Sequence, residues 1–311
     1  MTRLRIGTRA STLARTQSSL VADRLRDGMG VDVELVDVIT DGDKTKAPLT
    51  EIGGLGVFVG AVRQALVDGE VDVAVHSLKD LPTVPDERVL LAAVPEREDP
   101  RDALVARDGL TLAELPASAT VGTGSPRRAA QLNALGLGLS VVDVRGNVET
   151  RIARVTSGQL DAVVLARAGL IRLQRQVEVT EILDPLQMLP APGQGALAVE
   201  VAAASADLAG DVASVLDSAP TRCAVTAERS LLRALGAGCT APVGALAEYA
   251  EGDFGPEIWL RAVVAAPDGT WTIRLSMTGQ PDAAEDVGRR LAEELLTEGA
   301  GDLMLMSEPV A

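Results

Sequence analysis

The stretch TVGTGSPRR, residues 120–128, passes from a β-rich run through two glycines into the start of a helix. Ser125 is a natural N-cap, and Pro126 suits the first helical position. The stretch GTRAS, residues 7–11, repeats the pattern after another β-rich run, with Ser11 as the cap. A strand that leads directly into a helix is the building unit of α/β domains, so both stretches predict that class.

The same order extends over the first two thirds of the chain, where β-rich runs alternate with helical patterns. The β-rich runs are residues 4–7, 31–40, 71–75, 89–94, 103–105, 120–122, 140–144, 161–165 and 196–201. This alternation predicts α/β folding with mostly parallel sheets. From about residue 218 the order changes to a helix, three β-rich runs and a terminal helix. Their ranges are 222–235, 243–248, 257–265, 270–277 and 283–298, and APDG at 266–269 predicts a hairpin between the last two runs. This part predicts a smaller α+β domain.

Two proline-bearing stretches predict crossings between the α/β domains: EREDP at 96–100 and LPAPGQG at 189–195. We therefore expect the chain to leave the first domain, build a second and return, which places a hinge over a cleft. The predicted domains are 1–96 with 195–215, then 97–194, and then 216–311, which contains the cysteine loop. A chain of 311 residues is long enough for several cores.

The composition limits the possible functions. A net charge of −15 argues against a nucleic-acid binder, which needs a basic surface. Two cysteines and one histidine are too few for a disulfide framework or an ordinary structural zinc site, so we expect no metal. The N-terminal residues enter a strand-like run without a long apolar segment, which predicts a cytoplasmic protein without a membrane span.

Arginines gather at three strand-to-helix junctions. Arg9 lies in the first, Arg127 and Arg128 follow Ser125 in the second, and VRGNVETR at 144–151 forms the third. Helix N-termini expose unpaired N–H groups, and guanidinium groups bind carboxylates and phosphates in bidentate fashion. Three such junctions on one cleft would form an extended anion site.

Two further segments carry chemistry. In LGAGCTAPVG, residues 235–244, glycines surround Cys239 and leave room for a bulky group on its sulfur. In HSLKDLP, residues 76–82, Asp80 follows Lys79. The first segment suggests a covalent anchor and the second a carboxylate catalyst, although Asp80 taken alone is better explained as a surface loop aspartate paired with Lys79. We expect His76, the only histidine, to order this loop by hydrogen bonding.

Together these segments resemble the porphobilinogen deaminase family, also called hydroxymethylbilane synthase, over nearly the whole chain. The matching blocks, in the family order, are GTRAS at 7–11, GGLGVF at 53–58, HSLKDLP at 76–82, GTGSPRR at 122–128, VRGNV at 144–148, LPAPGQG at 189–195, TAER at 226–229 and GC at 238–239. The resemblance implies two periplasmic-binding-protein-like α/β domains and a third α+β domain. It also implies a dipyrromethane cofactor joined by a thioether to Cys239, onto which four porphobilinogen molecules are added with loss of ammonia before 1-hydroxymethylbilane is released.

The resemblance also implies roles for individual residues. Asp80 would stabilise the cationic pyrrole species and shuttle protons, because loss of ammonia leaves a positive charge. Lys79, Ser125, Arg127 and Arg128 would hold the cofactor carboxylates. The residues expected to contact substrate or the growing chain are Arg9, Ser11, Phe58, Arg145, Arg151, Arg172 and Gln194. The chain departs from some relatives at Glu51 and Leu55, where lysines occur, and at Thr12, where proline is common; lid behaviour and substrate affinity depend on these positions.

Other functions are consistent with parts of the pattern. A clamp of two α/β domains with arginines would also suit a non-enzymatic binding protein for small carboxylated anions, but such a protein needs neither the third domain nor its glycine-framed cysteine. A phosphate-handling enzyme is disfavoured because no Gly-x-x-x-x-Gly-Lys-Ser/Thr loop is present. An inactive homologue is disfavoured because the anchor, the carboxylate and the arginines are all present. By family expectation the protein is a monomer, and its product passes to uroporphyrinogen-III synthase.

Overall fold

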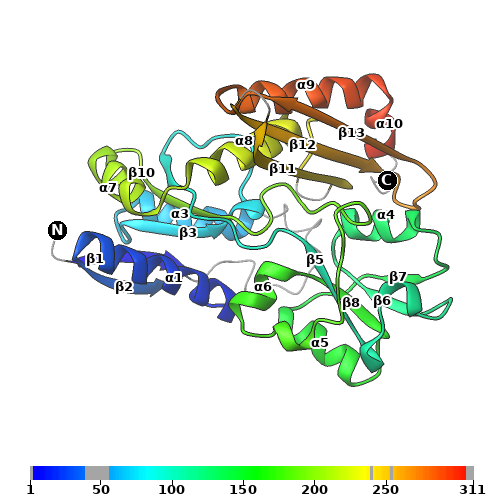
Figure 1. Cartoon of the computed structure of the whole chain (residues 1–311). Coiled ribbons are helices and arrows are strands. Elements are labelled where there is room, and N and C mark those ends of the chain that lie inside the picture. The colour runs from blue at the N-terminus through cyan, green and yellow to red at the C-terminus, as the bar shows by residue number, and fades with distance from the viewer. Residues whose placement is uncertain (1–2, 39–55, 239–240, 253–254, 306–311) are drawn as a thin grey trace. The chain divides into compact units, whose positions relative to one another are not determined.

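The computed structural model describes residues 3–38, 56–238, 241–252 and 255–305, drawn in colour in Figure 1. The chain forms two compact units. The first contains Met1–Glu98 and Ala196–Arg222, and the second contains Asp99–Gly195 and Cys223–Ala311. Three sheets are present among the described residues, two of five strands and one of three. The prediction of α/β folding followed by an α+β part is confirmed, whereas the three domain boundaries stay a prediction.

The sheet of the first unit has the strand order β2-β1-β3-β10-β4. Its strands are β1 (Arg3–Thr8), β2 (Asp32–Asp37), β3 (Val73–Ser77), β4 (Val89–Ala93) and β10 (Leu197–Ala202). The helices are α1 (Thr12–Met29), α3 (Gly56–Val67) and α7 (Ala206–Leu216). Helices α1 and α7 share one buried core with the strands, whereas α3 belongs to a second core that includes Val62, Leu66 and Val71. Both faces of this sheet are therefore covered, as in α/β folds.

The second five-stranded sheet has the order β7-β6-β8-β5-β9. Its strands are β5 (Asp102–Ala106), β6 (Thr120–Gly122), β7 (Ser140–Val142), β8 (Ala162–Ala166) and β9 (Glu181–Ile182). The helices are α4 (Pro126–Ala134), α5 (Val148–Thr156) and α6 (Arg167–Arg172). Short 3₁₀ helices cover Leu78–Asp80, Arg107–Gly109, Leu112–Glu114, Gln176–Glu178 and Pro281–Ala283.

The third sheet is an antiparallel meander of β11 (Val243–Gly252), β12 (Gly255–Ala265) and β13 (Thr272–Gly279). Its core packs against α8 (Ala219–Ala234), α9 (Ala284–Thr297) and α10 (Ala300–Leu305), as Figure 1 shows for the upper layer of helices. The predicted hairpin is confirmed: Ala266 N–H donates to Trp271 O at 2.8 Å, and Gly269 has φ +76°.

The expectation of mostly parallel sheets is wrong. Strand β10 runs antiparallel to both β3 and β4, and β5 runs antiparallel to both β8 and β9. Both strands enter their sheets directly from a crossing, without the helix that a parallel crossover connection needs. Each five-stranded sheet is therefore mixed, with an antiparallel strand supplied at the crossing.

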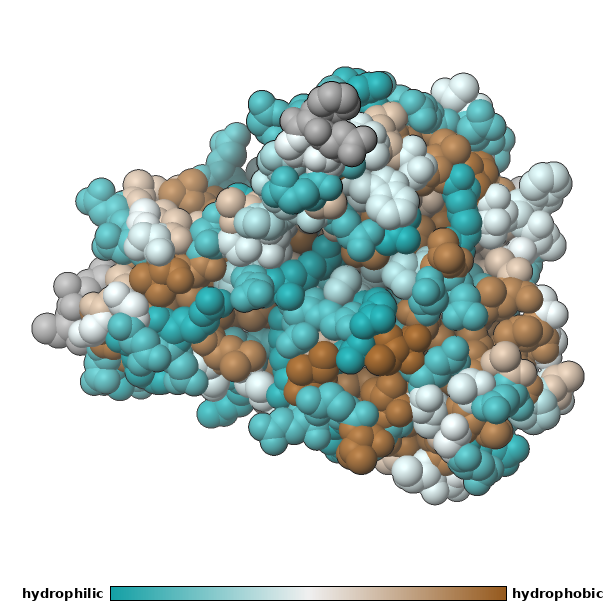
Figure 2. Space-filling view, in the orientation of Figure 1, coloured by the Kyte–Doolittle hydropathy of each residue, from teal (hydrophilic) through white to brown (hydrophobic). Residues whose placement is uncertain are grey.

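The surface is in keeping with the acidic composition. Hydrophilic residues cover much of the face in Figure 2, and hydrophobic residues form separate groups between them. Among the described residues, no helix has both the length and the apolar character that crossing a bilayer requires.

Candidate active site

The segment with Lys79 and Asp80 is a 3₁₀ turn held at the end of β3. Leu78 is fully buried, and its N–H donates to Ala196 O at 3.0 Å. One residue earlier, Ser77 Oγ lies 3.1 Å from Gln17 Nε2 of α1. Lys79 and Asp80 are half-buried. A buried leucine and two anchoring hydrogen bonds therefore present both side chains from an ordered turn.

Arg9 and Ser11 lie at the same edge of this sheet as Asp80. Strands β1 and β3 are parallel neighbours, with Ile6 opposite Val73, so their carboxyl ends adjoin. The Ser11 side chain caps α1 by accepting from Ala14 N–H at 3.3 Å, as the sequence predicts, and Arg9 is half-buried. The first unit thus brings a carboxylate, cationic side chains and a helix N-terminus to one edge.

His76 does not order the loop, contrary to our expectation. It lies within β3, 7% exposed, with Nε2 3.5 Å from Glu200 Oε2 on β10. Arg63 of α3 holds the same carboxylate through Nε at 2.9 Å and NH2 at 2.6 Å. Burial raises the pKa of Glu200, but the hydrogen bonds from Arg63 and the nearby His76 outweigh burial and lower this pKa to about 2. His76 therefore lies beside the buried Arg63–Glu200 ion pair beneath the turn.

In the second unit, the loop between β6 and α4 forms a compact helix N-terminus. Ser125 Oγ accepts from Arg128 N–H at 3.5 Å, and Ser125 N–H donates to Thr123 Oγ1 at 3.2 Å. A Cβ on Gly124 would lie 2.7 Å from Val144 O, so only glycine fits between the two strand-to-helix loops. At the neighbouring loop, Asn147 caps α5 by accepting from Thr150 N–H at 2.9 Å. Both predicted helix starts in this unit are confirmed.

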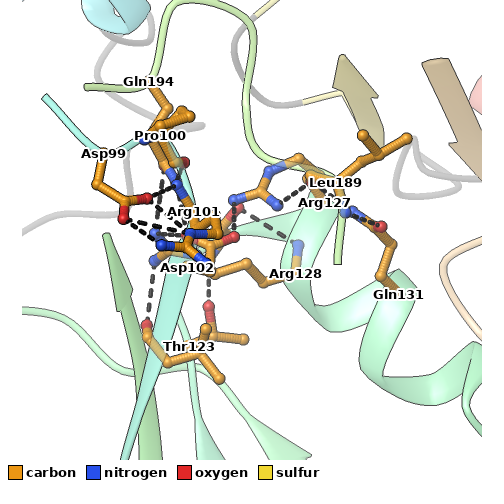
Figure 3. Close-up of polar contacts among 12 residues, drawn as sticks. Asp99, Pro100, Arg101, Asp102, Thr123, Arg127, Arg128, Gln131, Leu189 and Gln194 are labelled. Carbon is orange, nitrogen blue, oxygen red and sulfur yellow. Dashed lines mark hydrogen bonds and ion pairs between the residues drawn. The ribbon is translucent and has the colours of Figure 1, made fainter. Parts of the chain in front are cut away.

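Arg127 and Arg128 converge on one carboxylate, Asp102, at the start of β5 (Figure 3). The Arg127 NH2 lies 2.8 Å from Asp102 Oδ2, and the Arg128 NH2 lies 2.8 Å from Oδ1. Arg127 also donates to Leu189 O at 2.5 Å, and Arg128 to Val164 O at 3.1 Å. The two arginines are only 3% and 6% exposed. Both guanidinium groups are therefore buried, and their contact with the cofactor carboxylates stays a prediction.

Gln194 completes this cluster from the second crossing. Its Nε2 donates to Asp102 Oδ1 and to Pro100 O, both at 2.8 Å, and its side chain is fully buried. In this structure Gln194 therefore joins the two crossing segments, and its predicted contact with substrate is untested. Burial raises the pKa of Asp102, but the charges of Arg127 and Arg128 lower it to about 2.

The remaining predicted arginines differ in their surroundings. Arg151 is half-buried and donates to Gly146 O at 2.9 Å, and it forms no ion pair with the residues that the structure describes. Burial, followed by the charge of Arg128, lowers the pKa of Arg151 to about 10. Arg145 is exposed, 3.5 Å from Asp143, and Arg172 donates to Gly195 O at 2.7 Å. The low pKa of Arg151 thus reflects its burial first and the neighbouring positive charges second, and a bound anion would stabilise the charged guanidinium group.

Three buried residues of this region were missed by the sequence reasoning. Asp102 is an acidic residue at the head of an otherwise apolar strand, which is the one local sign of its role. Gln131 of α4 holds both backbone groups of Leu189, accepting at 2.8 Å and donating at 3.0 Å. Glu228 of α8 accepts from Gly193 N–H at 2.6 Å and Ala247 N–H at 2.8 Å. The second crossing is thus attached to α4 and, through Glu228, to α8 and to β11 of the third sheet.

Four residues named in the sequence analysis fall outside what the structure describes. Cys239, Glu51 and Leu55 lie outside the described residues, and the side chain of Phe58 in α3 is likewise not described. The described parts of the chain contain no group of three or more His, Cys, Asp or Glu side chains arranged to hold a metal ion.

The chain matches two family models in succession. Residues 4–210 match "Porphobilinogen deaminase, dipyromethane cofactor binding domain", and residues 222–297 match "Porphobilinogen deaminase, C-terminal domain".

Individual proteins agree with the family models. The porphobilinogen deaminase of Nocardia farcinica is 57% identical over 98% of this chain and 88% of its own length. Porphobilinogen deaminase 1 of Streptomyces avermitilis is 57% identical over 97% of both chains. Among solved structures, an arginine-specific periplasmic binding protein of Salmonella typhimurium aligns with a TM-score of 0.42 at 14% identity, over 69% of this chain and 92% of that chain. The two family models and the near full-length relatives show that this chain belongs to the porphobilinogen deaminase family.

Proposed function

We propose that this chain condenses four porphobilinogen molecules stepwise, with loss of ammonia, and releases 1-hydroxymethylbilane. In this proposal Asp80 is the catalytic carboxylate and Cys239 carries dipyrromethane through a thioether. The geometric observation that supports it is the surplus of positive charge where α4 begins: two buried arginines share one carboxylate, and Arg151 adds a third cation. A group with several carboxylates is the ligand that such a site requires.

The residues present fit dipyrromethane. Arg127 Nε is buried without a hydrogen-bond partner among the described residues, and the N-terminus of α4 lies beside it with Ser125 as cap. Both features favour a negatively charged group. We assign Lys79, Ser125, Arg127 and Arg128 to its carboxylates. When bound, dipyrromethane supplies the pyrrole end at which each substrate unit is added.

Asp80 acts on positive charge that develops on the substrate. When ammonia leaves porphobilinogen, the pyrrole nitrogen carries cationic character, and a carboxylate held nearby stabilises it. The same carboxylate accepts a proton when the pyrrole ring regains its neutral state. The anchored turn at Leu78–Asp80 favours this role because a preorganised charge does not have to reorient during the reaction.

Arg9, Ser11, Arg145, Arg151 and Arg172, with Phe58 and Gln194, are assigned to the substrate and the growing chain. A non-enzymatic binding protein for small carboxylated anions is not favoured, because the relatives that span the whole chain are named deaminases. The monomeric state, the cytoplasmic location and transfer of the product to uroporphyrinogen-III synthase remain proposals from the family.

The intact mass of the purified protein and of its Cys239→Ala variant tests the proposal. We expect the wild type to exceed its sequence mass by two linked pyrrole units, and the variant to show no excess. If the wild type is unmodified, it is incubated with porphobilinogen and weighed again. A protein that remains unmodified after this treatment contradicts the proposed function.

A further inference from the structure

Asp102 is a buried carboxylate to which the proposed chemistry assigns no role. It is the first residue of β5 and is fully buried. Its Oδ1 accepts from Arg128 Nε at 3.1 Å, from Arg128 NH2 at 2.8 Å and from Gln194 Nε2 at 2.8 Å, whereas Oδ2 pairs with Arg127 NH2 at 2.8 Å. Four contacts from three side chains fix the direction of both carboxylate oxygens, as Figure 3 shows.

The charges around Asp102 do not balance. Asp102 contributes one negative charge against the two positive charges of Arg127 and Arg128. The acidic residue nearest to Asp102 in the sequence, Asp99, is engaged by Arg101 at 2.7 Å and Arg167 at 2.6 Å. Counting the described residues, the cluster therefore keeps one positive charge in surplus. Buried charge of this kind requires a partner of opposite sign.

Asp102 determines both the size and the place of this surplus. Without its charge, two buried guanidinium groups would repel each other, and at least one would move toward solvent. If a second carboxylate lay beside Asp102, the two arginines would be fully neutralised and no positive charge would be left for an anionic ligand. The Asp102 oxygens also bind the Arg128 Nε–NH2 edge and the Arg127 NH2, which sets the directions in which the remaining N–H groups point.

Asp102 further connects the arginines to both crossings. Gln194, which donates to Asp102, also donates to Pro100 O at 2.8 Å. Arg127 donates to Leu189 O at 2.5 Å. A displacement of the Asp102 carboxylate therefore disturbs residues near 100 and 189–194 together with the start of α4.

Building on the proposed function, we propose that Asp102 is a positioning residue for cofactor binding. It orients Arg127 and Arg128 toward the dipyrromethane carboxylates and leaves one positive charge unneutralised to bind those carboxylates. Asp102 itself does not touch the cofactor in this proposal.

The test follows the mass of full-length apoprotein during incubation with porphobilinogen. We expect Asp102→Asn to load about 100-fold more slowly than the wild type, since a displacement of about 1 Å in a positioned group has effects of this size. Asp161→Asn is the matched control. Asp161 lies in the same unit and also holds an arginine, Arg107, at 2.9 Å, as well as Thr120 N–H at 2.6 Å. We expect this control to load at the wild-type rate.

Two further variants separate positioning from folding. Asp102→Glu keeps the charge, and we expect it to fold and to load faster than Asp102→Asn. The double variant Asp102→Asn with Arg127→Gln restores the surplus of one positive charge, so it should fold even if Asp102→Asn does not, and it should load more slowly than Arg127→Gln alone. Circular dichroism and thermal unfolding establish which variants are folded.

The outcomes distinguish this proposal from the proposed function. Folded Asp102→Asn loading at the wild-type rate, or a double variant loading as fast as Arg127→Gln alone, overturns the role of Asp102 and leaves the proposed function intact. A wild-type apoprotein that gains no mass overturns the proposed function instead. Equal slowing in Asp161→Asn would show that general loss of stability causes the effect, and would also overturn the positioning role.

Discussion

Replacing Glu200 by glutamine tests the buried Arg63–Glu200 ion pair beneath the Asp80 turn. Glu200 and Arg63 have side chains only 3% and 9% exposed, and they share two hydrogen bonds at 2.6 and 2.9 Å. The change Glu200→Gln keeps the volume of the side chain but removes its charge, so Arg63 is left buried without its partner. We expect a large loss of stability in the first unit.

The pKa of Glu200 gives the magnitude. A fall from the ordinary value of 4.5 to about 2 corresponds to about 3 kcal/mol of stability at pH 7. Breaking a buried ion pair by removing one partner typically costs a similar amount, about 3 to 5 kcal/mol. Because the folded-state pKa is lowered, this stability is present above the unfolded pKa of 4.5 and is lost as the pH falls toward 2. About half of it remains at pH 3.

Urea unfolding and hydrogen exchange at pH 7 and pH 3 measure the effect. The change Glu200→Gln should lower the free energy of opening of β3 and β10 by about 3 kcal/mol at pH 7, and by less at pH 3. Exchange at the Leu78–Asp80 turn should rise as well, because Leu78 N–H is bonded to Ala196, one residue before β10.

The matched control is Glu34→Gln. Glu34 also pairs with an arginine, Arg3, at 2.8 Å in the same unit, but the two side chains are 43% and 59% exposed. An exposed pair contributes at most about 1 kcal/mol. Equal destabilisation by Glu200→Gln and Glu34→Gln, or an effect of Glu200→Gln that does not depend on pH, would refute the reasoning.

Three further predictions concern catalysis, anion binding and packing. Asp80→Asn should keep the mass of the bound cofactor but lose up to about 1,000-fold in turnover. The reason is that two charges about 4 Å apart, at an effective dielectric constant near 20, interact by about 4 kcal/mol. Unchanged turnover would exclude Asp80 as the catalytic carboxylate. Arg151→Met removes a guanidinium group whose pKa is lowered to about 10 in the folded protein. The free energy of unfolding of the apoprotein should therefore rise by about 1 to 3 kcal/mol at pH 7, while the KM for porphobilinogen also rises. A variant less stable than the wild type would contradict this prediction. Gly288→Ala would place a Cβ 2.2 Å from Ala227 O and should lower the thermal midpoint by several degrees, whereas Gly210→Ala, with open space around it, should not.

Local features of the fold were predictable from the sequence. The caps at Ser11 and Ser125 and the hairpin at 266–269 depend on residues within a few positions of one another. The segments that bear chemistry were predictable for a related reason, because their residues occur in contiguous blocks. The blocks around Asp80 and Arg127 could therefore be identified without knowledge of the tertiary structure.

Features that depend on distant contacts were not predictable. Asp102 meets Arg127 and Gln194, which lie 25 or more positions away in sequence, and nothing local shows that one carboxylate serves both arginines. His76 faces Glu200 because two antiparallel strands place Ala198 opposite it, and that pairing depends on how β10 returns to the first sheet. The expectation of mostly parallel sheets was wrong for the same reason, since the direction of β10 depends on that return.

The place of β10 in the first sheet has a consequence for synthesis on the ribosome. Strand β10 lies between β3 and β4, yet its first residue, Leu197, follows the end of β4 at Ala93 by roughly one hundred residues. At about 5 to 20 residues per second, the nascent chain waits on the order of 5 to 20 seconds before this strand emerges. During that interval the facing edges of β3 and β4 are unpaired, and unpaired edges promote aggregation. Newly made chains should therefore depend on chaperones most strongly before residue 202 leaves the exit tunnel.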